Sequence, residues 1–117
     1  RLIMPNIERP RQALRIPGGW MVEHNDLFET EPSFSTFEDI SWDFGEDILL
    51  LSNKNRGLVI SLGWLSAHNE VGAFQLLEVQ LCEDSEKMPD AWSAPLKQFI
   101  SRSKSDVVRT LEEWLMV

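Results

Sequence analysis

Few residues in this sequence have the types and spacing that catalysis or metal binding requires. The two histidines, His24 and His68, do not form a metal-binding pattern such as HExxH. The single cysteine, Cys82, is followed by Glu83 and Asp84, whose negative charges disfavour a thiolate nucleophile. The sequence has no GxSxG nucleophile elbow, P-loop or GxGxxG motif. We therefore expect no catalytic, cofactor-binding or metal-binding residues and no enzyme; the alternative is a small hydrolase that uses a carboxylate or His24.

Three aspartates, Asp39, Asp43 and Asp47, recur at every fourth position. The calcium-binding loop of an EF-hand instead needs ligands at alternate positions and a glutamate at its last position. The spacing therefore does not predict a calcium site, and we expect the protein to need no cofactor.

Charge is the most informative property of the sequence. Nineteen acidic residues stand against eleven Lys and Arg, which gives a formal net charge of -8. Residues 23–47 contain nine carboxylates and no Lys or Arg, and residues 83–90 contain four more with one lysine. Phosphate backbones are bound through Lys and Arg, so the charge argues against a nucleic-acid reader. It predicts instead a protein partner with a basic surface, attracted over long range; the alternative is that acidity only keeps the protein soluble.

Aromatic residues are interleaved with the acids of residues 26–47. Apolar anchors surrounded by charge are typical of binding surfaces. The alternation of Ile40, Trp42 and Phe44 favours a core position for Trp42 and Phe44, whereas Phe34 and Phe37 lie in a predicted loop. We predict a partner-binding site of seven carboxylates and two phenylalanines: Glu29, Glu31, Phe34, Phe37, Glu38, Asp39, Asp43, Glu46 and Asp47.

Strands are predicted where apolar residues alternate or run together. The predicted strands cover residues 20–28, 40–44, 48–52, 58–65 and 73–82. The third and fourth of these flank a turn-forming segment, residues 53–57, so they should form a hairpin. In the last strand, Phe74 and Leu76 fall out of phase with the apolar residues that follow, which predicts either a bulge near Leu76 or a strand buried at one end.

Helices are predicted in the last quarter of the chain. A short helix is expected within residues 91–100, broken or begun around Pro95. Residues 104–116 have apolar side chains at helical spacing, and Ser103 with Asp106 resembles a capping box at their start. The fold class we predict is α+β, an antiparallel sheet of about four to five strands with a C-terminal helix packed on one face.

The length of 117 residues fits one domain. We expect an irregular leader with arginines and prolines over residues 1–18, followed by a single α+β domain over residues 19–117. No apolar run approaches the roughly 20 residues that cross a bilayer, so we expect no membrane partner. A single cysteine fits a reducing compartment, and we therefore expect a cytoplasmic protein.

Two segments of the chain resemble a known family. The segment from Ile16 to Asn25, Ile-Pro-Gly-Gly-Trp-Met-Val-Glu-His-Asn, is followed by Phe28 and an acidic stretch that ends in Pro32. It resembles the opening of small bacterial immunity proteins encoded beside contact-dependent growth inhibition and related polymorphic toxins. The ending, from Trp92 to Leu115, is similar to that family in kind.

The resemblance implies cytoplasmic residence, no catalysis, and tight binding to a toxin domain, very often a nuclease with a basic face. Together with the negative charge, it leads us to expect an immunity protein that binds and neutralises the C-terminal domain of a cognate toxin through an acidic surface. A self-associating structural subunit is a further alternative, and the sequence leaves the oligomeric state open.

Overall fold

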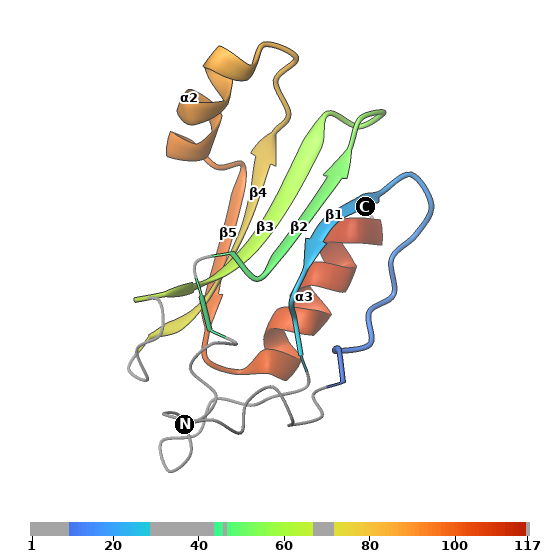
Figure 1. The fold of residues 1–117 in the computed structure, drawn as a ribbon, viewed down its shortest axis with the longest axis vertical. Coiled ribbons are helices and arrows are strands. Elements are labelled where there is room, and N and C mark those ends of the chain that lie inside the picture. Colours follow the sequence, from blue (N-terminus) through green and yellow to red (C-terminus); the bar gives the residue numbers. More distant parts are fainter. Residues whose placement is uncertain (1–9, 29–43, 46, 67–71, 117) are drawn as a thin grey trace, which may run out of the picture.

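The centre of the fold is a five-stranded antiparallel sheet in which the strands lie side by side in their sequence order (Figure 1). The computed structural model describes residues 10–28, 44–45, 47–66 and 72–116. Its elements are β1 (Met21–Asn25), β2 (Leu49–Asn53), β3 (Leu58–Leu65), β4 (Ala73–Gln80), the short 3-10 helix η3 (Ser85–Lys87), α2 (Met88–Ser93), β5 (Lys97–Ser101) and α3 (Lys104–Met116). The predicted α+β class, with an antiparallel sheet and a C-terminal helix, is confirmed.

The hairpin of β2 and β3 forms as the sequence predicts. Leu51 lies opposite Ile60, and the pairing continues to the turn. In the turn, the backbone N–H of Arg56 donates to the side-chain oxygen of Asn53 over 3.1 Å. Gly57 adopts a φ of 67°, a left-handed conformation that glycine accepts without steric cost. The predicted face of large residues on β3 lies toward the core, where Ile60 is fully buried.

Of the two alternatives predicted for this strand, the bulge near Leu76 is wrong, whereas the strand is buried on both faces near one end, at Glu78 and Val79. The pairing of β4 with β3 continues without a register shift over all eight residues of the strand. Phe74 and Leu76 lie in the core, whereas Leu77 and Val79 lie on the opposite face of the sheet. Val79 is nevertheless fully buried, and α2 contacts β4. The strand is apolar on both faces because both are covered. The core covers one face at Phe74 and Leu76, and the other face is buried at Val79.

The short helix predicted within residues 91–100 is wrong in its second half, which forms β5 at the edge of the sheet. Pro95 lies between α2 and β5, and it lacks the N–H that a continuing helix needs. The backbone N–H of Leu96 donates to the carbonyl of Glu78 over 2.7 Å, so pairing with β4 begins directly after the proline. Phe99 then packs against the core, with exposed neighbours on either side in the sequence.

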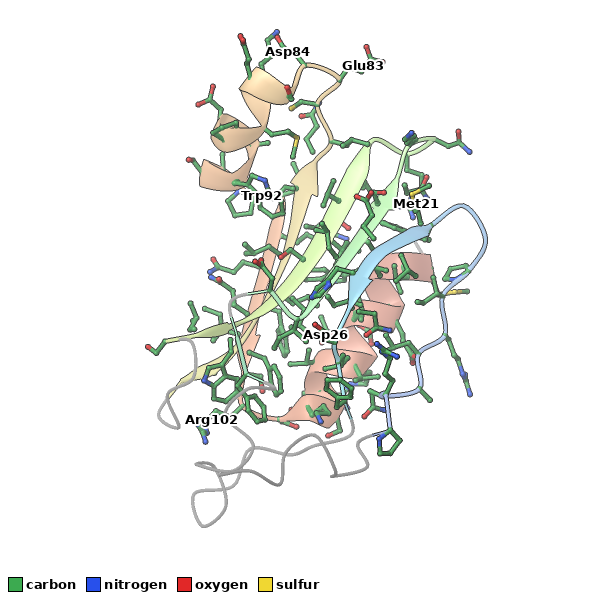
Figure 2. The ribbon with its side chains drawn as sticks, in the orientation of Figure 1. Met21, Asp26, Glu83, Asp84, Trp92 and Arg102 are labelled. Atoms are coloured by element: carbon green, nitrogen blue, oxygen red, sulfur yellow. The ribbon has the colours of Figure 1, made fainter. Side chains whose placement is uncertain are left out.

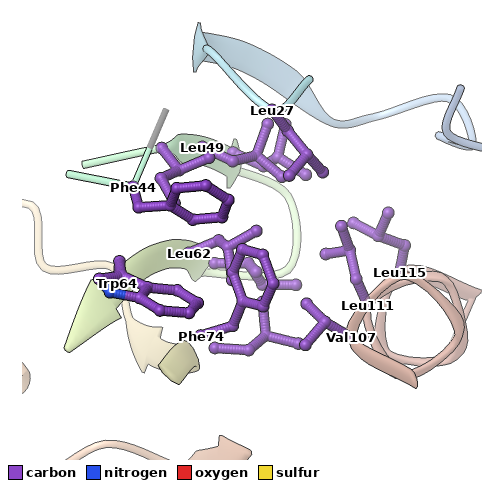
Figure 3. Close-up of a cluster of buried hydrophobic side chains, with 13 residues drawn as sticks. Leu27, Phe44, Leu49, Leu62, Trp64, Phe74, Val107, Leu111 and Leu115 are labelled. Carbon is purple, nitrogen blue, oxygen red and sulfur yellow. The ribbon is translucent and has the colours of Figure 1, made fainter. Parts of the chain in front are cut away.

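α3 spans the predicted residues, and only one half of the predicted capping box forms, because the backbone N–H of Ser103 donates to the Oγ of Ser101 and not to Asp106. The Oγ of Ser103 accepts a hydrogen bond from the backbone N–H of Asp106 over 3.3 Å, the interaction expected of an N-cap serine. Val107, Leu111 and Leu115 recur at helical spacing and are at most 2% exposed. Figure 3 shows all three directed from α3 toward the sheet. The helix is therefore held in place by one apolar stripe packed on one face of the sheet.

Three aromatic rings pack together in the same core (Figure 3). The ring centroid of Phe44 lies 4.8 Å from that of Trp64 and 5.8 Å from that of Phe74, and Trp64 meets Phe74 edge-on at 5.0 Å. Such tilted and edge-on contacts are the favourable aromatic geometries. The core position predicted for Phe44 is confirmed, although this residue lies in a bend. Trp42 and the rest of that predicted strand, residues 40–43, lie outside the described residues.

The described part of the predicted leader lies against α3. The backbone N–H of Arg15 donates to Oε2 of Glu112 over 2.7 Å, and the indole N–H of Trp20 donates to the carbonyl of Leu115 over 3.2 Å. Two further residues pack against the core: Leu14 and Ile16. These contacts attach residues 10–20 to the domain.

Candidate functional site

The structure describes one of the nine predicted partner-binding residues. The other eight lie outside the described residues: Glu29, Glu31, Phe34, Phe37, Glu38, Asp39, Asp43 and Glu46. Asp47 is exposed and lies just before β2. The described part of the chain offers three candidate binding surfaces. They are Asp47 with its neighbours, the connection between β4 and β5, and the sheet face turned away from α3.

Asp47 lies beside a histidine and carboxylate pair at the end of β1. The Nε2 of His24 lies 3.1 Å from Oδ2 of Asp26 and 3.2 Å from the carbonyl oxygen of Asp47. The backbone N–H of Asp26 donates to the carbonyl of Ile48 over 2.7 Å, which holds these residues together. The guanidinium of Arg11 lies 3.9 Å from Oδ1 of Asp26. The positive charge of Arg11 therefore already faces the carboxylate of Asp26 at this end of β1.

The pair of His24 and Asp26 has an arrangement in which a carboxylate can orient an imidazole for proton transfer. Both side chains are substantially exposed, 42% and 52% respectively. Cys82 follows β4, and two strands separate β4 from β1, so its thiol lies about 10 Å or more from His24. His24 and Cys82 therefore cannot form a nucleophile and base pair; His68 lies outside the described residues.

The described residues form neither a metal site nor a membrane-spanning helix. Over the described ranges, no group of three or more His, Cys, Asp or Glu side chains is placed to hold a metal ion. None of the described helices combines the length and the apolar character needed to cross a membrane.

The second acidic group lies on the connection between β4 and β5, which projects beyond one end of the sheet (Figure 2). Its four carboxylates are all exposed: Glu83, Asp84, Glu86 and Asp90. Oδ1 of Asp84 accepts a hydrogen bond from the backbone N–H of Glu86 over 2.9 Å and so caps η3. Trp92 and Leu96, on the same connection, are 36% and 55% exposed. The predicted site did not include this connection. The sequence contains a signal for it, because Trp92 closely follows the acidic stretch of residues 83–90.

The sheet face turned away from α3 has a different character. In β2 to β5 it carries these residues: Leu50, Ser52, Val59, Ser61, Gly63, Leu65, Ala73, Gln75, Leu77, Val79, Gln98 and Ile100. None of them is charged. Ile100 is 48% exposed and Leu65 is 37% exposed, whereas Phe99 on the other face packs into the core. In these four strands this face is therefore uncharged and partly apolar; Leu65 and Ile100 are open to solvent, whereas Ser52, Val59 and Val79 are buried.

Five of the nine Lys and Arg residues in the described part of the chain lie on the side of α3. The Nζ of Lys97 lies 3.8 Å from Oε2 of Glu78 and 5.6 Å from the ring of Trp114 in α3. The guanidinium of Arg56 lies 5.9 Å from the ring of Trp20, which itself bonds to α3. Three more cations belong to α3 or to the leader packed against it: Arg15, Lys104 and Arg109. Two of the other cations lie elsewhere, Arg11 at the end of β1 and Lys87 in the β4–β5 connection.

Comparisons with known proteins found no matching family model, no similar curated protein and no similar solved structure. The resemblance to immunity proteins therefore remains a hypothesis, and the function has to be argued from charge and surface.

Proposed function

We propose that this chain is a cytoplasmic immunity protein that binds and neutralises the C-terminal domain of a cognate contact-dependent growth inhibition toxin. The proposed toxin domain is a nuclease with a basic surface. The observation that carries the proposal is the formal net charge of -8, together with the exposed carboxylates of the β4–β5 connection. The acidic segment of residues 29–47 belongs to the proposal on its sequence alone.

The physical reason is that a nuclease must attract phosphates. Enzymes that bind nucleic acid present Lys and Arg to the phosphate backbone. An inhibitor with a matching set of carboxylates can occupy that surface, because opposite charges speed the encounter and align the two proteins. In the β4–β5 connection, four carboxylates accompany one cation, Lys87. The exposed side chain of Trp92 adds the apolar contact that binding surfaces commonly contain.

The resemblance to immunity proteins supports the same proposal. Its first segment, residues 16–25, forms the end of the leader and β1. Its last segment runs through α2, β5 and α3. The resemblance therefore covers the edge strands of the sheet and the helix that packs on it.

The proposal predicts that a neighbouring gene encodes a toxic C-terminal domain, and it is tested with that domain produced in a catalytically inactive form. Because long-range attraction is screened by salt, we expect the association rate to fall at least about tenfold between low and high ionic strength. Co-expression of this chain with the active domain should restore growth. A salt-independent association rate, or failure to bind and protect, would contradict the proposal.

A pair of matched variants identifies which carboxylates contribute. Glu83→Gln with Asp90→Asn removes two negative charges from the β4–β5 connection, and Glu112→Gln with Glu113→Gln removes two from α3. We expect the first pair to slow association at low salt more than the second pair does. Equal rates for the two would show that only the total charge matters.

A hydrolase remains the second candidate, because the imidazole of His24 lies 3.1 Å from a carboxylate oxygen of Asp26. Replacing His24, His68 and Cys82 together should abolish the activity of such an enzyme. The same triple variant of an immunity protein should still protect cells from the toxin.

A further inference from the structure

We infer that the toxin domain docks on the sheet face turned away from α3, with the acidic β4–β5 connection as one border of the interface. This inference rests on the proposed function and adds the surface that performs it. It also places part of the binding energy on the apolar side chains of this face.

The first argument is the contrast between the two faces of the sheet. On one face, α3 and the aromatic rings cover the sheet, and Ile60, Leu62 and Leu76 are fully buried. On the other face, Ile100 and Leu65 leave large parts of their side chains in water. Exposed apolar side chains that share one surface are a common mark of a protein-binding site.

The area of the sheet face can be compared with the area that a stable protein interface needs. Five strands at about 4.8 Å spacing make a face about 24 Å wide, and about five paired residues at about 3.3 Å each make it about 17 Å long. The product, roughly 400 Å², is an upper bound, because Ser52, Val59 and Val79 on this face are already buried. Even this upper bound is only about half of the roughly 800 Å² that each partner contributes to a stable complex. The β4–β5 connection, with Trp92 and Leu96 exposed, extends the surface beyond the end of the sheet.

The charges beside the sheet face favour a basic protein as the binding partner. The sheet face itself is uncharged in β2 to β5, and the connection at its end carries Glu83, Asp84, Glu86 and Asp90. Most described cations lie on the side of α3, away from this face. A second copy of the chain would bring two sets of carboxylates together, and like charges oppose such an interface. A cationic domain would meet an apolar centre and an acidic border.

The experiment compares the same substitution on the two faces. Ile100→Arg places a positive charge in the sheet face, and Met116→Arg places one on α3, where Met116 is 70% exposed. Both variants change the net charge equally, so any loss of long-range attraction is common to them. The dissociation constant for the inactive toxic domain from the neighbouring gene is measured by calorimetry. We expect Ile100→Arg to weaken binding at least about tenfold and Met116→Arg to weaken it less than about threefold.

A second variant guards against misfolding of the first. Gln98 is exposed, polar and on the same face, opposite Leu77, so Gln98→Arg should leave the core unchanged. Circular dichroism and the melting temperature establish whether each variant is folded. We expect Gln98→Arg to weaken toxin binding more than Met116→Arg does.

Each other outcome overturns a distinct statement. The wild-type protein could bind the toxin while neither Ile100→Arg nor Gln98→Arg weakens binding more than Met116→Arg does. That result would overturn the location of the interface and leave the proposed function standing. No binding by wild-type protein would overturn the proposed function and the inference with it. A wild-type dimer that Ile100→Arg converts to a monomer would assign the face to a second copy of the chain.

Discussion

The packing of α3 on the sheet is tested most directly at Leu111. Its side chain is fully buried between Val107 and Leu115 along the helix. Replacing a fully buried leucine by alanine costs about 2–5 kcal/mol, because apolar contacts are lost and a cavity remains. Since domains are stable by about 5–15 kcal/mol, Leu111→Ala should remove roughly a third of the free energy of unfolding. At about 4 °C per kcal/mol for this size, the melting temperature should fall by about 8–20 °C.

Urea unfolding, followed by tryptophan fluorescence, measures the loss. Met116→Ala is the matched control, because Met116 lies on the same helix and is 70% exposed. We expect that control to change the free energy of unfolding by no more than about 0.5 kcal/mol. The dependence of the free energy on urea should be the same in both variants if the folded state keeps its compactness.

The reasoning would be refuted by two results. Equal losses for Leu111→Ala and Met116→Ala would mean that the buried stripe does not hold α3 on the sheet. A loss below about 1 kcal/mol for Leu111→Ala would mean that no cavity forms at this position.

Three further substitutions test local features by thermal melts. A Cβ at Gly72 would lie 1.9 Å from a backbone carbonyl of β3, whereas one at Gly18 would meet nothing within 4 Å, so Gly72→Ala should destabilise by about 1–3 kcal/mol or more and Gly18→Ala should not. Ser103→Ala removes the N-cap of α3 and should cost about 0.5–2 kcal/mol; no change would mean that the cap is dispensable. Lys97→Met leaves the buried carboxylate of Glu78 without its cation and should cost about 1–3 kcal/mol. Adding Glu78→Leu should recover most of that loss; if it does not, the ion pair is not the cause.

Local patterns were sufficient for the elements whose partners are close in the sequence. The hairpin of β2 and β3 follows from two apolar runs around a turn that ends in Gly57. The span of α3 follows from Ser103 and the apolar spacing after it. In both cases the residues that decide the structure lie within about twenty positions of one another.

The two errors have a common cause, which is contact between distant segments. β4 is apolar on both faces because α3 packs on one side of the sheet and Val79 is buried on the other, and no local rule contains that information. Residues 97–101 form a strand because β4 offers an unpaired edge, as the bond from Leu96 to Glu78 shows.

The candidate surface shows the same division. The acidic stretch at residues 83–90 is visible in the sequence, but the sheet face that it borders is not. Ile100 becomes a candidate contact because Phe99 beside it packs into the core, and that choice depends on where α3 lies. The eight predicted site residues within residues 29–43 and 46 fall outside the described residues, so their role remains a prediction.

All five strands precede α3 in the chain, and this order affects how the protein is made. A ribosome adds about 5–20 residues per second, so the thirteen residues of α3 are synthesised over a time on the order of one second after those of β5. Until α3 packs on the sheet, Leu62 and Phe74 have no helix against them, and the nascent chain exposes apolar surface to the cytosol or to other proteins. Chaperones that recognise such surfaces would meet this protein on the ribosome, and the emergence of the helix would end their access.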